Sequence, residues 1–136
     1  MSERRFFDSN LLVYAHDDRE PGKRKLARQL LTSHLRERTA VFSTQVLQEY
    51  FVTAKKKGVS ADTARHHVVA YSKLSVVQVT IDLILGAIDL HRLHQISFWD
   101  ALILRAARAG GCSVVLSEDL NDGQTYDGVR VENPFA

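Results

Sequence analysis

The sequence predicts an α/β fold with a mainly parallel sheet, because short apolar segments of strand character alternate with longer segments of helical periodicity. The chain has 136 residues, the size of one domain, and 45% of them are hydrophobic, which supplies material for a core. It has no internal repeat, no low-complexity tract and only two prolines, so nothing marks the start of a second domain. We expect a single globular domain over residues 1–136.

The first part of the chain is expected to form a strand, a helical turn and an amphipathic helix. The strand covers residues 4–7 and the helical turn residues 11–15, and a polar break separates them from the helix at residues 23–38. Apolar side chains recur on one face of that helix: Leu26, Leu30, Leu31 and Leu35. The opposite face is mostly basic or polar.

A second strand and two helices follow. The strand covers residues 39–43 and leads into a helix over residues 44–57, which Gly58 ends. The side chains expected to point inward from this helix are Val46, Leu47, Tyr50, Phe51 and Ala54. Ser60 is expected to cap the next helix, which runs to about residue 74.

The rest of the chain is expected to return to the sheet three times. Residues 76–79 predict a third strand and residues 82–94 a further helix. The stretch SFWDALILRAARAGGCSVVLSEDL contains a helix over residues 100–110 and a strand over residues 113–118. After a turn, residues 129–132 are expected to form an edge strand.

Four acids are expected to meet at one edge of this sheet. Asp8 directly follows the first strand, and Glu49 lies about one turn inside the helix after the second, leaning back toward the start of that helix. Between Asp100 and Asp119 a helix carries the chain roughly 15 Å away and a strand returns it roughly 16 Å. Because ligands meet a parallel sheet at the carboxyl ends of its strands, this edge is the expected site.

Bringing these acids together predicts a cation site. Two carboxylates about 5 Å apart repel by roughly 3 kcal/mol at an effective dielectric constant of about 20, and four of them form several such pairs. A divalent cation removes this cost, and oxygen ligands favour Mg²⁺ or Mn²⁺ over zinc. Each acid alone also fits a cap, a turn or a solvated position, so it is the convergence of the four that predicts the site.

With these residues in view, the chain resembles the PIN-domain nucleases, and among them the VapC-type toxins of bacterial toxin–antitoxin systems. The matching stretches, in the family's order, are FFDSNLLVYAHD, STQVLQEYF, SFWDALILRAARAGGCSVVLSEDLNDGQ and GVRVENPF. The resemblance implies a three-layer α/β/α fold. It also implies that the catalytic, metal-binding acids are Asp8, Glu49, Asp100 and Asp119. Ser117 takes the small hydroxyl place before the last acid, and Asn10 the polar place after the first.

The function implied by the resemblance is Mg²⁺- or Mn²⁺-dependent hydrolysis of RNA by one ion or two. Such an endoribonuclease is the toxin of a type II system, forms a homodimer and pairs with a cognate VapB-type antitoxin. Glu118 and Asp122 are interpreted as turn residues, with contact to a second ion as the alternative. The cytoplasm is the expected location. The lone Cys112 lies between Gly111 and the apolar residues 114–116, which favours a buried thiol over a disulfide, and no apolar run approaches the ~20 residues of a membrane span.

RNA binding would need cations around the acidic site. Candidates lie at the start of one helix and the end of another: Lys23, Arg24, Lys25, Arg28, Lys55, Lys56 and Lys57. Charged helix faces are also commonly just solvated, and the net charge of +2 does not decide between the two interpretations.

Two other classes of function remain open from the sequence. One is a phosphoryl-transfer or phospho-acceptor domain with Asp8 as nucleophile, although Asn10 stands where a phosphatase of that kind would have a second Asp. The other is a binding module with a degenerate site, against which the presence of all four acids argues. His91 and His94 share a helix face, but no third ligand near them completes a zinc site.

Overall fold

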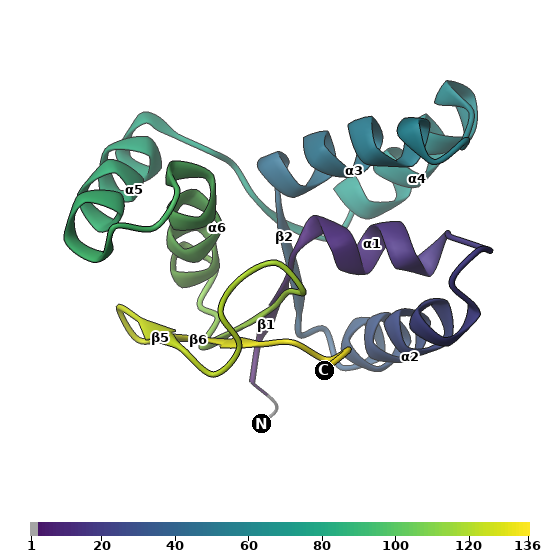
Figure 1. The fold of residues 1–136 in the computed structure, drawn as a ribbon. Helices are drawn as coiled ribbons and strands as arrows, with labels where there is room; N and C mark the ends of the chain where they lie inside the picture. Colours follow the sequence, from purple (N-terminus) through teal and green to yellow (C-terminus); the bar gives the residue numbers. More distant parts are fainter. Residues whose placement is uncertain (1–2) are drawn as a thin grey trace.

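The computed structural model of the protein describes residues 3–136, and over these residues it confirms the α/β fold with a mainly parallel sheet (Figure 1). The strands are β1 (Arg5–Phe7), β2 (Ala40–Ser43), β3 (Ser75–Val77), β4 (Val114–Leu116), β5 (Thr125–Tyr126) and β6 (Val129–Glu132). The helices are α1 (Ser9–Ala15), α2 (Pro21–Arg36), α3 (Thr44–Lys56), α4 (Ala61–Ser72), α5 (Ile81–His94) and α6 (Phe98–Ala109). No helix of this described part is both long and apolar enough to cross a membrane.

The strands form one sheet in the order β3-β2-β1-β4-β6-β5, and every neighbouring pair is parallel except β5 with β6. The expectation that residues 129–132 form an edge strand is wrong, because β6 lies between β4 and β5. The cause is the tight turn at Asp127 and Gly128, whose φ values of 51° and 82° close a hairpin. The short strand β5 therefore occupies the edge.

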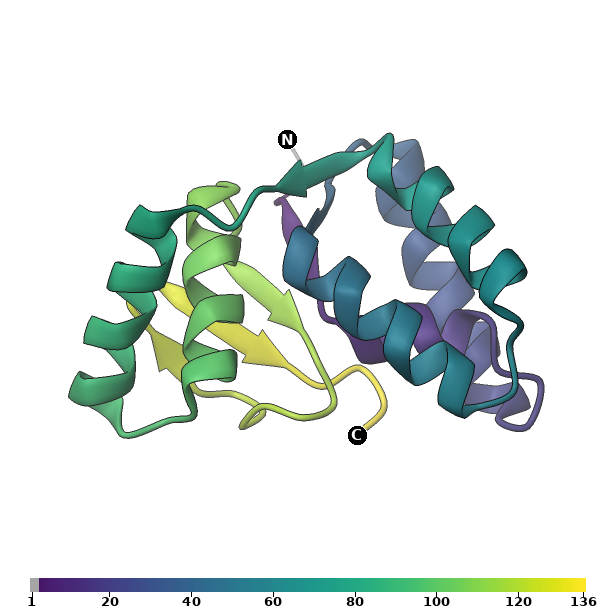
Figure 2. The same cartoon turned by 90° about the horizontal axis from the view of Figure 1, so that it is seen from above.

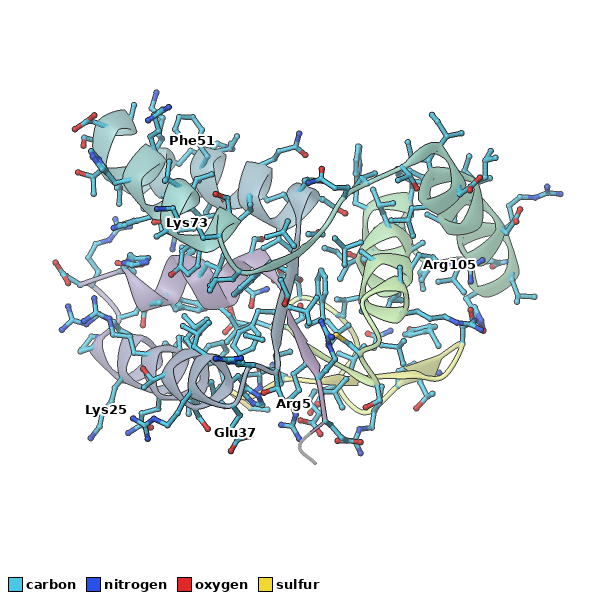
Figure 3. All side chains as sticks on the ribbon, turned by 180° about the vertical axis from the view of Figure 1, so that it is seen from behind. Arg5, Lys25, Glu37, Phe51, Lys73 and Arg105 are labelled. Carbon is cyan, nitrogen blue, oxygen red and sulfur yellow. The ribbon has the colours of Figure 1, made fainter. Side chains whose placement is uncertain are left out.

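Helices lie on both sides of the strands, which confirms the three-layer arrangement. Helices α5 and α6 are on one side of β1 and β2, and α1 and α2 are on the other (Figures 1 and 3). Seen from above, α6 overlies β4 and β6 while α5 packs on the outer side of α6 (Figure 2). Helix α3 starts directly at the carboxyl end of β2 and packs against α1 and α4.

The central strand β1 is buried on both faces. Phe6 and Phe7 point to opposite faces of the sheet, as successive strand residues do, and both are fully buried. The ring of Phe7 lies 5.8 Å from that of Phe42 on β2, measured between centroids. Burial on both faces is the normal state of a parallel strand covered by helices.

The apolar face expected for helix α2 is buried only in part. Leu31 is buried and Leu30 is partly buried, but Leu35 remains 37% exposed. Leu35 lies in the last turn of α2, beside an open groove that Leu74 also lines. The helix instead buries Ala27, a small side chain one turn before Leu31.

Hydroxyl side chains fix the starts of four helices. Ser43, Ser60, Thr80 and Ser97 each accept a hydrogen bond from the backbone N–H three residues further on. The expected cap at Ser60 is thus confirmed, as is the end of α3 at Gly58, where φ is 94°. These caps fix the residue at which each helix begins, and therefore the position of every side chain along that helix.

Gly110, which follows α6, provides a test of the packing of this helix on the sheet. An added Cβ at Gly110 would stand 2.9 Å from Cγ1 of Val41 and 3.0 Å from Cγ2 of Val77. Because Val41 is buried in β2, we expect Gly110→Ala to lower the free energy of unfolding by about 1–3 kcal/mol, measured by urea denaturation.

Gly22→Ala is the matched control. An added Cβ at Gly22, in α2, meets no atom within 4 Å. This substitution should therefore be neutral or stabilise the protein by up to about 1 kcal/mol, because alanine favours the helix. Equal losses of stability in the two variants would contradict the close packing at Gly110.

Candidate active site

Asp8 lies at the carboxyl end of β1 and also caps α1. Its Oδ1 accepts a hydrogen bond of 2.7 Å from the backbone N–H of Ser9, and its Oδ2 accepts one of 2.7 Å from the hydroxyl of Ser117. The side chain is only 6% exposed. Burial raises the pKa of Asp8 to about 6, against the lowering effect of these two hydrogen bonds, and the charges of Glu49 and Asp119 raise it further.

Asn10 connects the end of β1 to the segment that follows β4. Its Nδ2 lies 3.1 Å from Oδ2 of Asp119 and 3.5 Å from Oδ2 of Asp8. The same atom is 3.4 Å from Oγ of Ser117. Its Oδ1 accepts a hydrogen bond of 3.2 Å from the backbone N–H of Glu118. The side-chain amide of Asn10 therefore bridges Asp8 and Asp119, and it also holds the loop that carries Asp119.

Glu49 and Asp100 come from two different helices, α3 and α6. Nε2 of Gln45, one turn before Glu49, lies 3.4 Å from Oε2 of Glu49 and 3.2 Å from the carbonyl oxygen of Trp99. Burial raises the pKa of Glu49, the hydrogen bond from Gln45 lowers it, and the charges of Asp100 and Asp119 raise it. Gln45 thus joins Glu49 to the backbone directly before Asp100.

The four acids line one cavity of about 430 Å³. Asp8 is buried, Glu49 and Asp100 are half-buried, and Asp119 is exposed. The expected meeting of these acids is therefore present in the geometry. Their role as metal ligands stays a prediction.

The carboxylate oxygens that line this cavity are the type of ligand that a hard divalent cation prefers. Among residues 3–136, no three His, Cys, Asp or Glu side chains stand close enough together to hold a metal ion as they are placed. However, burial, and to a smaller extent the charges of the neighbouring acids, raise the pKa of Asp8 and Glu49, and a bound cation would offset the cost of keeping both carboxylates charged. The four carboxylates already line one cavity, and their oxygen atoms suit Mg²⁺ or Mn²⁺ if they draw closer together.

The basic residues considered for RNA contact do not line this cavity: Lys23, Arg24, Lys25, Arg28, Lys55, Lys56 and Lys57. Three of them form ion pairs, Lys23 with Glu118, Arg24 with Asp18, and Lys57 with Asp17. A separate groove of about 700 Å³ on α2 is lined by Arg24, Lys25 and Arg28. Figure 3 shows Lys25 at the outer surface of this helix.

The two acids interpreted as turn residues, Glu118 and Asp122, both have partners within the protein. Glu118 accepts hydrogen bonds from Tyr14 and Lys23, at 2.6 and 2.7 Å. Asp122 accepts one of 2.9 Å from the backbone N–H of Asn133. These contacts support the interpretation of both as structural residues of the turn.

Two contributions to the site were missed in the sequence. Gln45 could have been found, because it stands four residues before Glu49 and one helical turn separates such residues. The pairing of Lys23 with Glu118 could not, since 95 positions separate them and nothing local connects them.

Comparison with known proteins agrees with this architecture. One matching structure is a chain of a toxin–antitoxin complex from Klebsiella pneumoniae, with a TM-score of 0.68, 22% identity, and 96% of this chain and 97% of that chain covered. Another is VapC20 of Mycobacterium tuberculosis, a sarcin–ricin loop cleaving toxin, with a TM-score of 0.70, 20% identity, and coverages of 93% and 98%. A third is a chain of VapBC2 from Rickettsia felis bound to a DNA fragment from its promoter, with a TM-score of 0.68, 18% identity, and coverages of 95% and 97%.

These identities are low, and the likeness establishes a shared fold. Comparison with curated protein sequences gives no match. The family model of the PIN domain, however, matches residues 5–123, which span most of the chain and all four acids of the cavity. The chain therefore belongs to the PIN-domain family.

Proposed function

We propose that this protein is a Mg²⁺- or Mn²⁺-dependent endoribonuclease and the toxin of a type II toxin–antitoxin system. The observation that carries the proposal is the single cavity lined by Asp8, Glu49, Asp100 and Asp119, in a chain of the PIN-domain family. These acids come from four separate places in the fold, and burial, with a smaller effect of neighbouring charges, raises the pKa of Asp8 and Glu49. The four acids have little structural use as a group. Charge neutralisation by a divalent cation gives them one.

The four acids would hold the ion, which when bound lowers the pKa of a water molecule and offsets charge on the phosphate. The other residues keep the carboxylates in place. The hydroxyl of Ser117 and the amide of Asn10 orient Asp8 and Asp119, and Gln45 orients Glu49. The acids themselves repel RNA, so binding would depend on the ion and on exposed cations such as Lys25 and Lys56.

The proposed partners are an antitoxin of the VapB type and a second copy of this chain. Two of the similar structures are of complexes with antitoxins. The exposed face of α5 carries Ile81, Leu85 and Ile88, which are 71%, 54% and 39% exposed. An apolar helix face of this kind suits a protein partner. A toxin that cleaves RNA in its own cell would act in the cytoplasm.

Digestion of RNA tests the proposed activity. With Mn²⁺ or Mg²⁺ present we expect cleavage, and Asp8→Asn should reduce its rate by a factor of about 100 or more, because the amide removes a charged ligand from the centre of the site. Asp62→Asn, at an exposed position of α4, is the matched control and should cleave normally. Cleavage that survives both chelation and Asp8→Asn would refute the proposal.

The pH dependence of stability tests the burial of Asp8. Its pKa is raised from 3.8 to about 6 in the folded protein, so the stability contributed by its protonated form is present below about pH 4 and is lost as the pH rises through about 6. Without metal, Asp8→Asn should therefore stabilise the protein at pH 8 by up to about 3 kcal/mol and leave it little changed at pH 4.

The measurement is urea denaturation in the presence of a chelator at pH 4, 6 and 8. The difference between Asp8→Asn and the unsubstituted protein is the quantity of interest, because titrating groups that do not interact with Asp8 contribute equally to both. A difference that does not vary with pH would show that Asp8 keeps an ordinary pKa in the fold.

A further inference from the structure

Lys23 lies in a polar and aromatic cluster beside the acidic cavity. Its Nζ is 2.7 Å from Oε2 of Glu118 and 3.2 Å from the hydroxyl oxygen of Tyr14. The same nitrogen stands over the rings of Tyr14 and Phe135, 4.7 and 5.7 Å from their centroids. The Tyr14 hydroxyl donates a hydrogen bond of 2.6 Å to Oε1 of Glu118. Both carboxylate oxygens of Glu118 are thus occupied.

These contacts hold the ammonium group of Lys23 against Glu118 and Tyr14, while its side chain remains 37% exposed. It has three N–H donors, and two of them are taken by Glu118 and Tyr14. A group held in this way has one donor left for an RNA phosphate. Lys25, two residues further along α2, is exposed, so its side chain is more accessible to RNA than that of Lys23.

Glu118 is held from two directions, through its side chain and its backbone. The side chain is fixed by Lys23 from α2 and Tyr14 from α1, while the backbone N–H is bound by Oδ1 of Asn10. Asp119 follows immediately, and its backbone N–H donates to Oγ of Ser117. Holding Glu118 away from the cavity leaves Asp119 as the residue of this loop that lines it.

We propose that Lys23 is a positioning residue which, through Glu118, fixes the loop that presents Asp119 to a divalent cation. The inference rests on the proposed metal-dependent function and replaces the interpretation of Lys23 as an RNA contact. It connects α2, which contributes no residue to the cavity, to the binding of the ion.

The test compares Lys23→Met with Lys23→Arg and with Lys25→Met, in the full-length chain. Mn²⁺ is titrated while thermal unfolding is followed, because an ion that binds only the folded state raises the melting temperature. We expect Lys23→Met to raise the Mn²⁺ concentration for the half-maximal shift by about tenfold or more. Lys23→Arg keeps the charge beside Glu118 and should restore most of the affinity, and Lys25→Met should leave it unchanged.

Glu118→Gln provides a second route to the same result if Lys23→Met fails to fold. It weakens the ion pair from the other side, so it should raise the required Mn²⁺ concentration as well. When both substitutions are combined, the loss should be no greater than in the more affected single variant, since each breaks the same contact.

RNA cleavage at saturating Mn²⁺ separates positioning from phosphate contact. A positioning role predicts that Lys23→Met leaves the KM for RNA and its salt dependence unchanged. A higher KM with weaker salt dependence, together with unchanged Mn²⁺ affinity, would show instead that Lys23 binds phosphate and would overturn the inference. If the unsubstituted protein shows no shift with Mn²⁺, the metal site itself fails; a shift that Lys23→Met and Glu118→Gln both retain in full overturns the positioning role alone.

Discussion

The burial of one carboxylate at the end of the central strand is the constraint on which the site depends. Asp8 is 6% exposed, and an ionised group there loses its hydrating water unless the protein supplies hydrogen bonds. The strand register provides one of them. Phe7 on β1 is opposite Leu116 on β4, so the residues that follow, Asp8 and Ser117, come to lie side by side. A shift of this register would leave the carboxylate without its hydroxyl partner.

The other acids reach the same place because their helices begin at fixed points. Ser43 caps α3 directly after β2, which sets Glu49 just over one turn into that helix. Ser97 caps α6, which sets Asp100 in its first turn. Neither acid is in a long loop, so their positions follow from the packing of α3 and α6. The cavity is therefore a product of the sheet order and of the helix caps.

Much of this architecture could be predicted from the sequence because its signals are local. The alternation of strands and helices, the cap at Ser60 and the end of α3 at Gly58 each depend on a few neighbouring residues. The exposure of Leu35 depends on where α2 ends relative to the sheet, and the position of β6 depends on a hairpin that adds a further strand. The contact between Lys23 and Glu118 joins segments 95 positions apart, which only the folded chain brings together.

The amide of Asn10 has a consequence for the charge of the site. Its two N–H groups face three oxygen atoms at 3.1 to 3.5 Å, so it sets a partial positive pole between Asp8 and Asp119 without cancelling either charge. The amide therefore moderates the repulsion between these two acids while leaving both carboxylates able to bind a cation in the proposed nuclease.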